Sequence, residues 1–174
     1  ADALDAVMGN AVSETEQIGR AWMLTGGKRW RPLLTASVFD AYGGAVERIR
    51  DVAVAVECFH KASLVHDDIE DNEEFWYGRK TVQAEFGVSP AVNVGDYLVG
   101  LGYNLITSQA NQTGIEATAK ILSSLSKAHL DLCRGQGAEI MWKGIKGESL
   151  KSVEALSIYA MKTAPAFEAA LATG

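Results

Sequence analysis

The feature of this 174-residue sequence that most constrains its fold is residues 52–65 (VAVAVECFHKASLV), where apolar residues occur on every side of a helix. A helix that is apolar all round is buried at the centre of its fold, so other helices must surround it. This segment runs directly into residues 66–74 (HDDIEDNEE), which contain six carboxylates. The sequence therefore predicts a buried central helix that ends in concentrated negative charge.

Elsewhere apolar residues recur at spacings of three and four, and glycine-rich or polar stretches separate these segments. No internal repeat or linker divides the chain, so residues 1–174 are predicted to form a single all-α domain, a helical bundle around the central helix. A hydrophobic fraction of 48% and a charged fraction of 22% are typical of a globular domain of this size. We predict no strand, and helices over 12–24, 32–42, 46–73, 90–109, 115–141 and 149–172.

Charge and cysteine content limit the partners and the compartment. The formal net charge of −6 argues against a general nucleic-acid surface and favours a cation as the electrostatic partner. The N-terminus lacks the pattern of a signal peptide, and no stretch approaches the roughly 18 apolar residues of a membrane span. Cys58 and Cys133 lie far apart in apolar helical stretches, which suits a reducing interior. We therefore expect a soluble, cytoplasmic protein.

The carboxylates at the end of the central helix lie where the helix dipole disfavours them. Each anion there costs about 0.3–1 kcal/mol, and like charges three or four residues apart add a similar penalty. Asp67 and Asp71 share a face and Asp68 precedes Asp71 by three, so the three carboxylates can converge on an ion such as Mg²⁺. The alternative is a solvated acidic turn. The apolar helix that leads into these residues and the unfavourable helix dipole disfavour that alternative. His60 and His66 lie on different faces and are poorer metal ligands.

A basic segment, residues 25–32 (TGGKRWRP), precedes the second predicted helix. Its two glycines come before the cations, and its proline suits the first turn of a helix. A helix N-terminus with cations binds phosphate, with Lys28 as a point charge and Arg31 as a fork. Taken alone, the segment is also typical of an exposed basic loop.

Residues 162–165 (KTAP) lie within the last predicted helix. Pro165 should kink this helix and leave a free backbone dipole beside the ammonium of Lys162 and the hydroxyl of Thr163. The alternative interpretation is a simple kink at the protein surface.

Together these segments resemble the trans-isoprenyl diphosphate synthases, the polyprenyl synthetase family, over most of the chain. The resemblance implies the isoprenoid-synthase type of helical bundle. In order, the family motifs GGKRxRP, H-x-x-SLIHDDxxD, GD-x-L, GQxxD and KT resemble GGKRWRP (26–32), HKASLVHDDIED (60–71), GDYL (95–98), RGQGAE (134–139) and KTA (162–164).

The resemblance implies an enzyme in which Mg²⁺ draws the diphosphate from an allylic substrate. The double bond of isopentenyl diphosphate then attacks the resulting carbocation, and no side-chain nucleophile is required. The residues that the resemblance implies are Asp67, Asp68 and Asp71 for Mg²⁺; Lys28, Arg31 and His60 for isopentenyl diphosphate; and Lys162, Thr163 and Gln136 for the allylic diphosphate and the catalytic step.

The sequence departs from the family pattern in three ways. WYG (76–78) stands where the family has Arg-Arg-Gly, so two cations are missing; Arg79 and Lys80 follow, but in shifted positions. Glu139 replaces the Asp of GQxxD, a conservative change with a longer reach. The sequence stops at Gly174, before the second Asp-rich motif that completes the family's metal site, and we expect a chain that lacks this C-terminal portion.

Three functions compete. The first is a chain-elongating prenyltransferase. The second is a terpene cyclase on the same scaffold, favoured by the missing arginines but opposed by the retained Lys28, Arg31 and His60. The third is a non-catalytic regulatory subunit, favoured by the absent second motif but opposed by the intact DDxxD, because such a subunit has no need for mutually repelling carboxylates.

Product length and oligomeric state follow from two further segments. Ser63 and Ala62, four and five residues before Asp67, are expected to line the path of the allylic tail, with Phe59 as the next floor. In the family that the sequence resembles, bulky aromatic residues at these positions form a floor that stops growth at farnesyl, so small residues imply geranylgeranyl or longer. Alternatively, the small residues only allow a neighbouring helix to pack closely. Residues 94–106 (VGDYLVGLGYNLI) are more apolar than one intramolecular face requires, which with the family resemblance predicts a homodimer.

Overall fold

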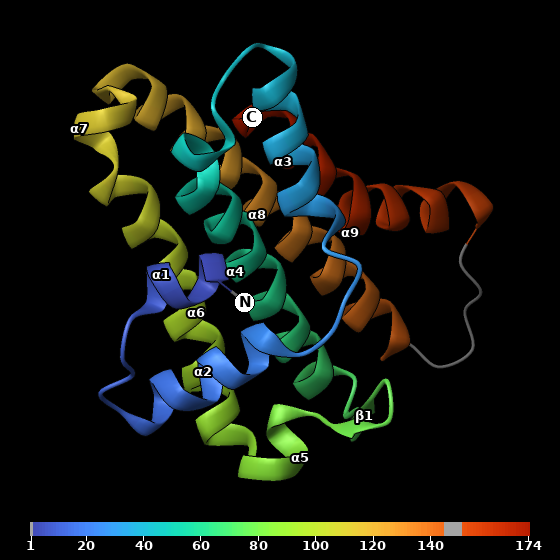
Figure 1. The fold of residues 1–174 in the computed structure, drawn as a ribbon. Helices are drawn as coiled ribbons and strands as arrows, with labels where there is room; N and C mark the ends of the chain where they lie inside the picture. Colours follow the sequence, from blue (N-terminus) through green and yellow to red (C-terminus); the bar gives the residue numbers. More distant parts are fainter. Residues whose placement is uncertain (1, 145–150) are drawn as a thin grey trace.

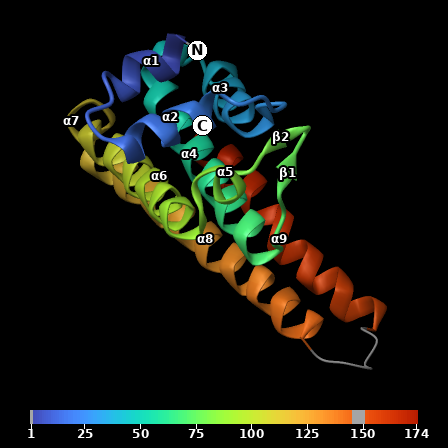
Figure 2. The same ribbon diagram turned by 90° about the horizontal axis from the view of Figure 1, so that it is seen from below.

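The computed structural model describes residues 2–144 and 151–174, and its fold is a helical bundle built around one long helix (Figure 1). That helix, α4, packs against α3, α6 and α9, and Figure 2 shows α6, α4 and α9 running side by side with α8. The elements are α1 (Asp2–Met8), α2 (Glu14–Leu24), α3 (Trp30–Ala41), α4 (Val46–Glu70), β1 (Phe75–Trp76), β2 (Arg79–Lys80), α5 (Val82–Phe86), α6 (Val88–Ser108), α7 (Ala110–Thr113), α8 (Ile115–Lys143) and α9 (Ser152–Thr173).

The predicted all-α class is confirmed, and the six predicted helices correspond to α2, α3, α4, α6, α8 and α9. The prediction of no strand was wrong, because β1 and β2 form a short antiparallel hairpin in which Trp76 pairs with Arg79. The short helices α1, α5 and α7 were also not predicted. The predicted start of the last helix, at 149 and 150, lies outside the described residues.

Helix α4 ends at Glu70, earlier than the predicted residue 73. The backbone of Asn72 is left-handed, with φ of 54°, and its N–H donates to the carbonyl of Ile69 at 3.2 Å. The N–H of Glu73 donates to the carbonyl of Asp68 at 2.8 Å, which completes a Schellman motif. Asparagine is one of the few residues other than glycine that adopt this conformation readily, so Asn72 terminates the helix.

The predicted burial of the central helix is confirmed for most of its circumference. On one broad side of α4, Val52, Ala55, Cys58, Ala62 and Val65 are at most 2% exposed. On the opposite side, Ala53, Glu57 and Lys61 are at most 8% exposed. One face, described below, lines a cavity instead of packing against a neighbouring helix.

Helix α6 approaches α4 closely at two glycines. A Cβ atom on Gly95 would lie 2.2 Å from Nε2 of His66, and one on Gly102 would lie 2.9 Å from Cζ of Phe59. The glycine of GDYL (95–98) therefore makes room for the histidine that precedes the acidic end of α4.

The apolar character of residues 94–106 is largely explained within one protomer. Val94, Leu98, Leu105 and Ile106 are all buried in the core that α6 forms with α4. The segment therefore gives no support of its own to the expected homodimer. Among the described residues, none of the helices combines the length and the apolar character needed to cross a membrane.

Helices α8 and α9 meet at Gly135. A Cβ atom there would lie 2.8 Å from Cβ of Met161, 2.9 Å from its carbonyl carbon and 3.0 Å from the backbone nitrogen of Lys162. Backbone atoms cannot move aside as a flexible side chain can. Gly135, the first glycine of RGQGAE (134–139), thus allows α8 to bring its polar side chains next to those of α9.

We predict that Gly135→Ala destabilises the protein by about 1–3 kcal/mol through overpacking of this crossing. Gly137→Ala is the matched control, because a Cβ atom at Gly137 meets nothing within 4 Å. That change should be neutral or stabilise by up to about 1 kcal/mol, the difference in helix propensity. Urea unfolding of both variants measures the effect, and equal stabilities would contradict it.

Candidate active site

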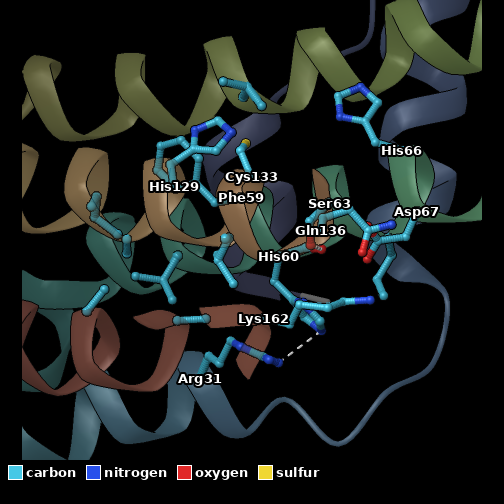
Figure 3. A pocket seen from close by; sticks show the side chains of 18 of the residues that line it. Arg31, Phe59, His60, Ser63, His66, Asp67, His129, Cys133, Gln136 and Lys162 are labelled. Atoms are coloured by element: carbon cyan, nitrogen blue, oxygen red, sulfur yellow. Dashed lines mark hydrogen bonds between the residues drawn. The ribbon is translucent and has the colours of Figure 1, made fainter. Parts of the chain in front are cut away.

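A cavity of about 340 Å³ lies between α4, α6, α8 and α9, and its two ends differ in character (Figure 3). One end is apolar and includes Val56, Phe59, Val99 and Leu125. The other end is polar, and its side chains come from four helices: Arg31, His60, His66, Asp67, Glu70, Gln136 and Lys162. The cavity can thus hold an elongated apolar molecule with an anionic head.

One face of α4 forms the wall that joins the two ends. Phe59, Ser63, Asp67 and Glu70 follow one another at spacings of three and four, so they project from the same side of the helix. The aromatic ring comes first and the carboxylates come last. The order of residues along α4 therefore sets the change from apolar to polar.

The guanidinium group of Arg31 lies at the polar end, where α3 begins. Its Nη1 lies 3.1 Å from Nε2 of His60, and its Cζ lies 4.7 Å from the centroid of the Phe167 ring (Figure 3 shows the first contact). Burial, followed by the charges of Arg31, Lys61 and Arg29, lowers the pKa of His60 to about 3. His60 is therefore neutral and can accept a hydrogen bond from Arg31.

Lys28 is not among the residues that line the cavity, and its side chain is exposed. The neighbouring Arg29 is left-handed, with φ of 53°, and its guanidinium pairs with the buried carboxylate of Glu57. Arg29 also donates to the carbonyl of Thr25 at 3.0 Å. The loop is thus fixed by Arg29, while Arg31 reaches the cavity and Lys28 faces solvent.

A buried lysine that the sequence analysis did not identify holds the other side of this loop. Lys61 is 1% exposed, and its Nζ donates to Oγ1 of Thr25 at 2.8 Å. The same Nζ lies 4.8 Å from the Trp22 ring centroid and 4.7 Å from that of Trp76, both cation–π distances. Burial and the charge of Arg29 lower the pKa of Lys61 to about 8.

This arrangement explains the tryptophan in WYG (76–78). Trp76 packs into the protein against Trp22 and Lys61 instead of lining the cavity. Its ring therefore replaces the expected arginine with a contact that attaches the β1–β2 hairpin to α4. The signal for this was available in the sequence as a lysine inside an apolar helix, which requires a partner.

The three carboxylates predicted to bind a metal occupy different environments. Asp67 lines the cavity, and burial raises its pKa to about 6 against the opposing effect of Lys162. Asp68 is 7% exposed and lies outside the cavity lining; burial and then the charge of Asp67 raise its pKa to about 6. Asp71 is the C-cap of α4, and its Oδ1 lies 2.8 Å from Nζ of Lys143.

Side chains of α8 link this acidic end to α9. Lys143 also lies 2.9 Å from Oε1 of Glu139, whose Oε2 lies 2.5 Å from Nζ of Lys162. Gln136 donates through Nε2 to Oε2 of Glu70 at 2.8 Å. The structure therefore brings Gln136 and Lys162 together at the polar end, whereas Thr163 is exposed and does not line the cavity.

The donor set fits Mg²⁺ in its chemistry. In residues 2–144 and 151–174, no three His, Cys, Asp or Glu side chains converge closely enough to hold a metal ion. However, Oδ2 of Asp68 is buried without a hydrogen-bond partner. Burial raises the pKa of Asp67 and of Asp68, and the nearby lysines Lys162 and Lys61 do not offset this effect. Carboxylate oxygens are what Mg²⁺ prefers, so metal binding by Asp67, Asp68 and Asp71 stays a prediction.

The three residues expected to control product length do not share one surface. Phe59 and Ser63 line the cavity, and the Phe59 ring packs edge-on against Tyr103 with centroids 4.8 Å apart. Ala62 is fully buried outside the cavity lining, which corrects its placement. His129 and Cys133 on α8 also line the cavity and were not predicted as site residues.

A helical bundle with an apolar cavity, a basic loop and an acidic helix end defines an isoprenoid-synthase type of protein. The family model for polyprenyl synthetase matches residues 12–174, and the chain belongs to this family. It is 30% identical to the geranylgeranyl pyrophosphate synthase of Geoglobus acetivorans over 83% of this chain and 44% of the relative. It is also 30% identical to the chloroplastic geranylgeranyl pyrophosphate synthase of Catharanthus roseus, over 98% of this chain and 48% of the relative.

Solved structures agree with this membership. The geranylgeranyl pyrophosphate synthetase of Pyrococcus horikoshii matches with a TM-score of 0.89 and 30% identity, over 98% of this chain and 51% of that chain. The geranyltranstransferase of Thermotoga maritima matches with a TM-score of 0.83 and 30% identity, over 95% and 61%. The present chain spans about half the length of the curated relatives it matches.

We predict that Asp68→Asn stabilises the metal-free protein by about 1–2 kcal/mol at pH 8. The pKa of Asp68, about 6 in the folded protein, lies above its ordinary value of 3.8, so the ionised carboxylate destabilises the folded state above pH 6. The advantage of asparagine should fade as the pH falls from 6 to 4, because the native carboxylate then becomes protonated. Urea unfolding with a chelator present, at several pH values, measures this.

Asp131→Asn serves as the control with the opposite sign. Hydrogen bonds from Lys127 and Arg134 lower the pKa of Asp131, so its ionised form stabilises the folded state. A stabilising effect of Asp68→Asn that persisted unchanged at pH 4 would contradict the explanation from burial.

Proposed function

We propose that the protein is a Mg²⁺-dependent prenyltransferase that condenses isopentenyl diphosphate with an allylic diphosphate to give a longer trans-polyprenyl diphosphate. The observation that carries the proposal is a cavity that has both cationic and acidic side chains at one end and apolar side chains at the other. The prenyl chain of the allylic substrate would occupy the apolar end. Its diphosphate would lie near Asp67 and Lys162.

The residues of α3 and α4 support a separate place for isopentenyl diphosphate. Arg31 is held by His60 and Phe167, so little conformational freedom remains to be lost when it binds an anion. Because His60 is neutral, it adds no charge of its own beside the guanidinium group of Arg31. Lys28, on the exposed part of the same loop, would add a second cation from the solvent side.

The polar end opposite Arg31 would hold the leaving diphosphate. Lys162 faces the cavity between Glu139 and Asp67, and Gln136 orients Glu70 by a hydrogen bond. Mg²⁺ bound by Asp67, Asp68 and Asp71 would supply the charge that stabilises diphosphate as it leaves. Thr163 is the least supported of the proposed catalytic residues, because its side chain is exposed.

A terpene cyclase is the second candidate, favoured by Trp76 and Tyr77 in place of two arginines. The position of Trp76 weakens this argument, since its ring has a structural role beside Lys61. A non-catalytic regulatory subunit is less favoured still, because a formed cavity with a cationic end has no purpose in it. We also propose a homodimer in the cytoplasm, for which the family resemblance and the two unpaired cysteines are the support.

We predict that Arg31→Ala raises the KM for isopentenyl diphosphate about 10- to 100-fold, with a much smaller change for the allylic substrate, through loss of a charge-assisted contact. Steady-state kinetics with labelled isopentenyl diphosphate measures both values. Arg134→Ala is the control, since this exposed arginine pairs with Asp131 on the surface of α8. Hydrocarbon formed from an allylic diphosphate alone would instead establish the cyclase.

We further propose a product of geranylgeranyl length or longer, because the wall at Ser63 is small. Ser63→Phe should place a ring in the cavity and shorten the product, with the dependence on Mg²⁺ unchanged. Ala62→Phe should instead overpack the core and cost about 1–3 kcal/mol of stability or more, because Ala62 is fully buried. Chromatography of the products and thermal unfolding separate the two effects; an unaltered product from Ser63→Phe would contradict this path for the tail.

A further inference from the structure

Lys143 lies at the end of α8 and bridges two carboxylates that belong to different helices. Its Nζ is 2.8 Å from Oδ1 of Asp71, the C-cap of α4, and 2.9 Å from Oε1 of Glu139, one turn earlier on α8. Glu139 in turn contacts Lys162 of α9. Two ammonium groups and two carboxylates therefore alternate from the end of α4 to the middle of α9.

The ammonium group of Lys143 offsets a local excess of negative charge. Asp71 lies at the negative end of the dipole of α4, four residues after Asp67 and three after Asp68. A cation at this place is favoured by the dipole and by each neighbouring carboxylate. Its hydrogen bonds to Asp71 and Glu139 raise the pKa of Lys143, so the side chain remains charged.

We propose that Lys143 is an internal counter-ion that competes with Mg²⁺ for Asp71, and that it binds the diphosphate when the metal displaces it. This inference rests on the proposed function. A divalent ion at Asp71 would repel the ammonium group, because two positive charges would then lie beside the same carboxylate. The side chain of Lys143 is 47% exposed and unbranched, so its Nζ can leave Asp71 without disturbing the core.

Removal of Lys143 should change the affinity for metal and the affinity for diphosphate in opposite directions. Without the ammonium group, Asp71 is available to metal at once, and metal alone should bind more tightly. With diphosphate present, the protein has lost a cation that can act as a point charge on phosphate oxygens, so the anion should bind less tightly. A lysine that only stabilises the end of α8 would produce neither change.

The test compares Lys143→Met with the wild type in the intact protein, using Mn²⁺ as a probe with the same preference for carboxylates. Electron paramagnetic resonance measures the affinity for Mn²⁺ alone, which should increase about two- to fivefold, as expected for a partly exposed ion pair. Calorimetry with inorganic diphosphate at saturating Mn²⁺ should show an affinity about three- to tenfold lower. Lys143→Gln provides a second variant in case methionine impairs folding.

Lys127→Met is the matched control. Lys127 lies on the same helix and pairs with Asp131 at 2.9 Å over the same four-residue spacing that joins Lys143 to Glu139. This variant should leave both affinities unchanged. Equal Mn²⁺ affinity in wild type and Lys143→Met, or an unchanged diphosphate affinity, would overturn the inference. A wild-type protein that binds no Mn²⁺ even with diphosphate would instead contradict the proposed function.

Discussion

The buried ammonium group of Lys61 lies over two indole rings that pack against each other, and it connects α4 with two segments that are distant in the sequence. It donates to Thr25 and Gly26 in the loop before α3, and it contacts Trp22 on α2 and Trp76 in the hairpin. A buried charge without partners would cost several kcal/mol, so folding requires these segments to meet around α4. Both the basic loop and the hairpin after the acidic end are positioned as a consequence.

A second buried charge, Glu57, acts in the same way one turn earlier on α4. Its partner Arg29 adopts a left-handed backbone, which costs about 1–2 kcal/mol for a residue other than glycine. The ion pair with Glu57 and the hydrogen bonds to backbone carbonyls offset that cost. Because Arg29 is held in this way, α3 begins at the next residue and Arg31 reaches the side of His60. The position of Arg31 at the cavity thus depends on two charged residues that lie outside the cavity lining.

The sequence predicts the bundle because burial all round the central helix and helical spacing elsewhere are local properties. It does not predict the partners of Lys61, since they depend on which segments meet in three dimensions. The error at Ala62 has a simple geometric origin. At 3.6 residues per turn, Ser63 lies about 40° from Asp67 around the helix, whereas Ala62 lies about 140° away and faces the opposite side. Likewise, Asn72 ends α4 because its conformation outweighs the helical pattern that continues to residue 73.

The acidic end of α4 is built so that a cation is needed there. Burial disfavours the ionised forms of Asp67 and Asp68, and Asp68 keeps a buried oxygen without a partner. The cations at hand, Lys143 and Lys162, are both shared with Glu139, so they neutralise the carboxylates only in part. A group that is destabilised in the free protein gains more when a cation arrives, because binding then removes the repulsion as well as forming the new contact. The stability lost at this helix end would therefore be recovered as affinity for a cation that binds there.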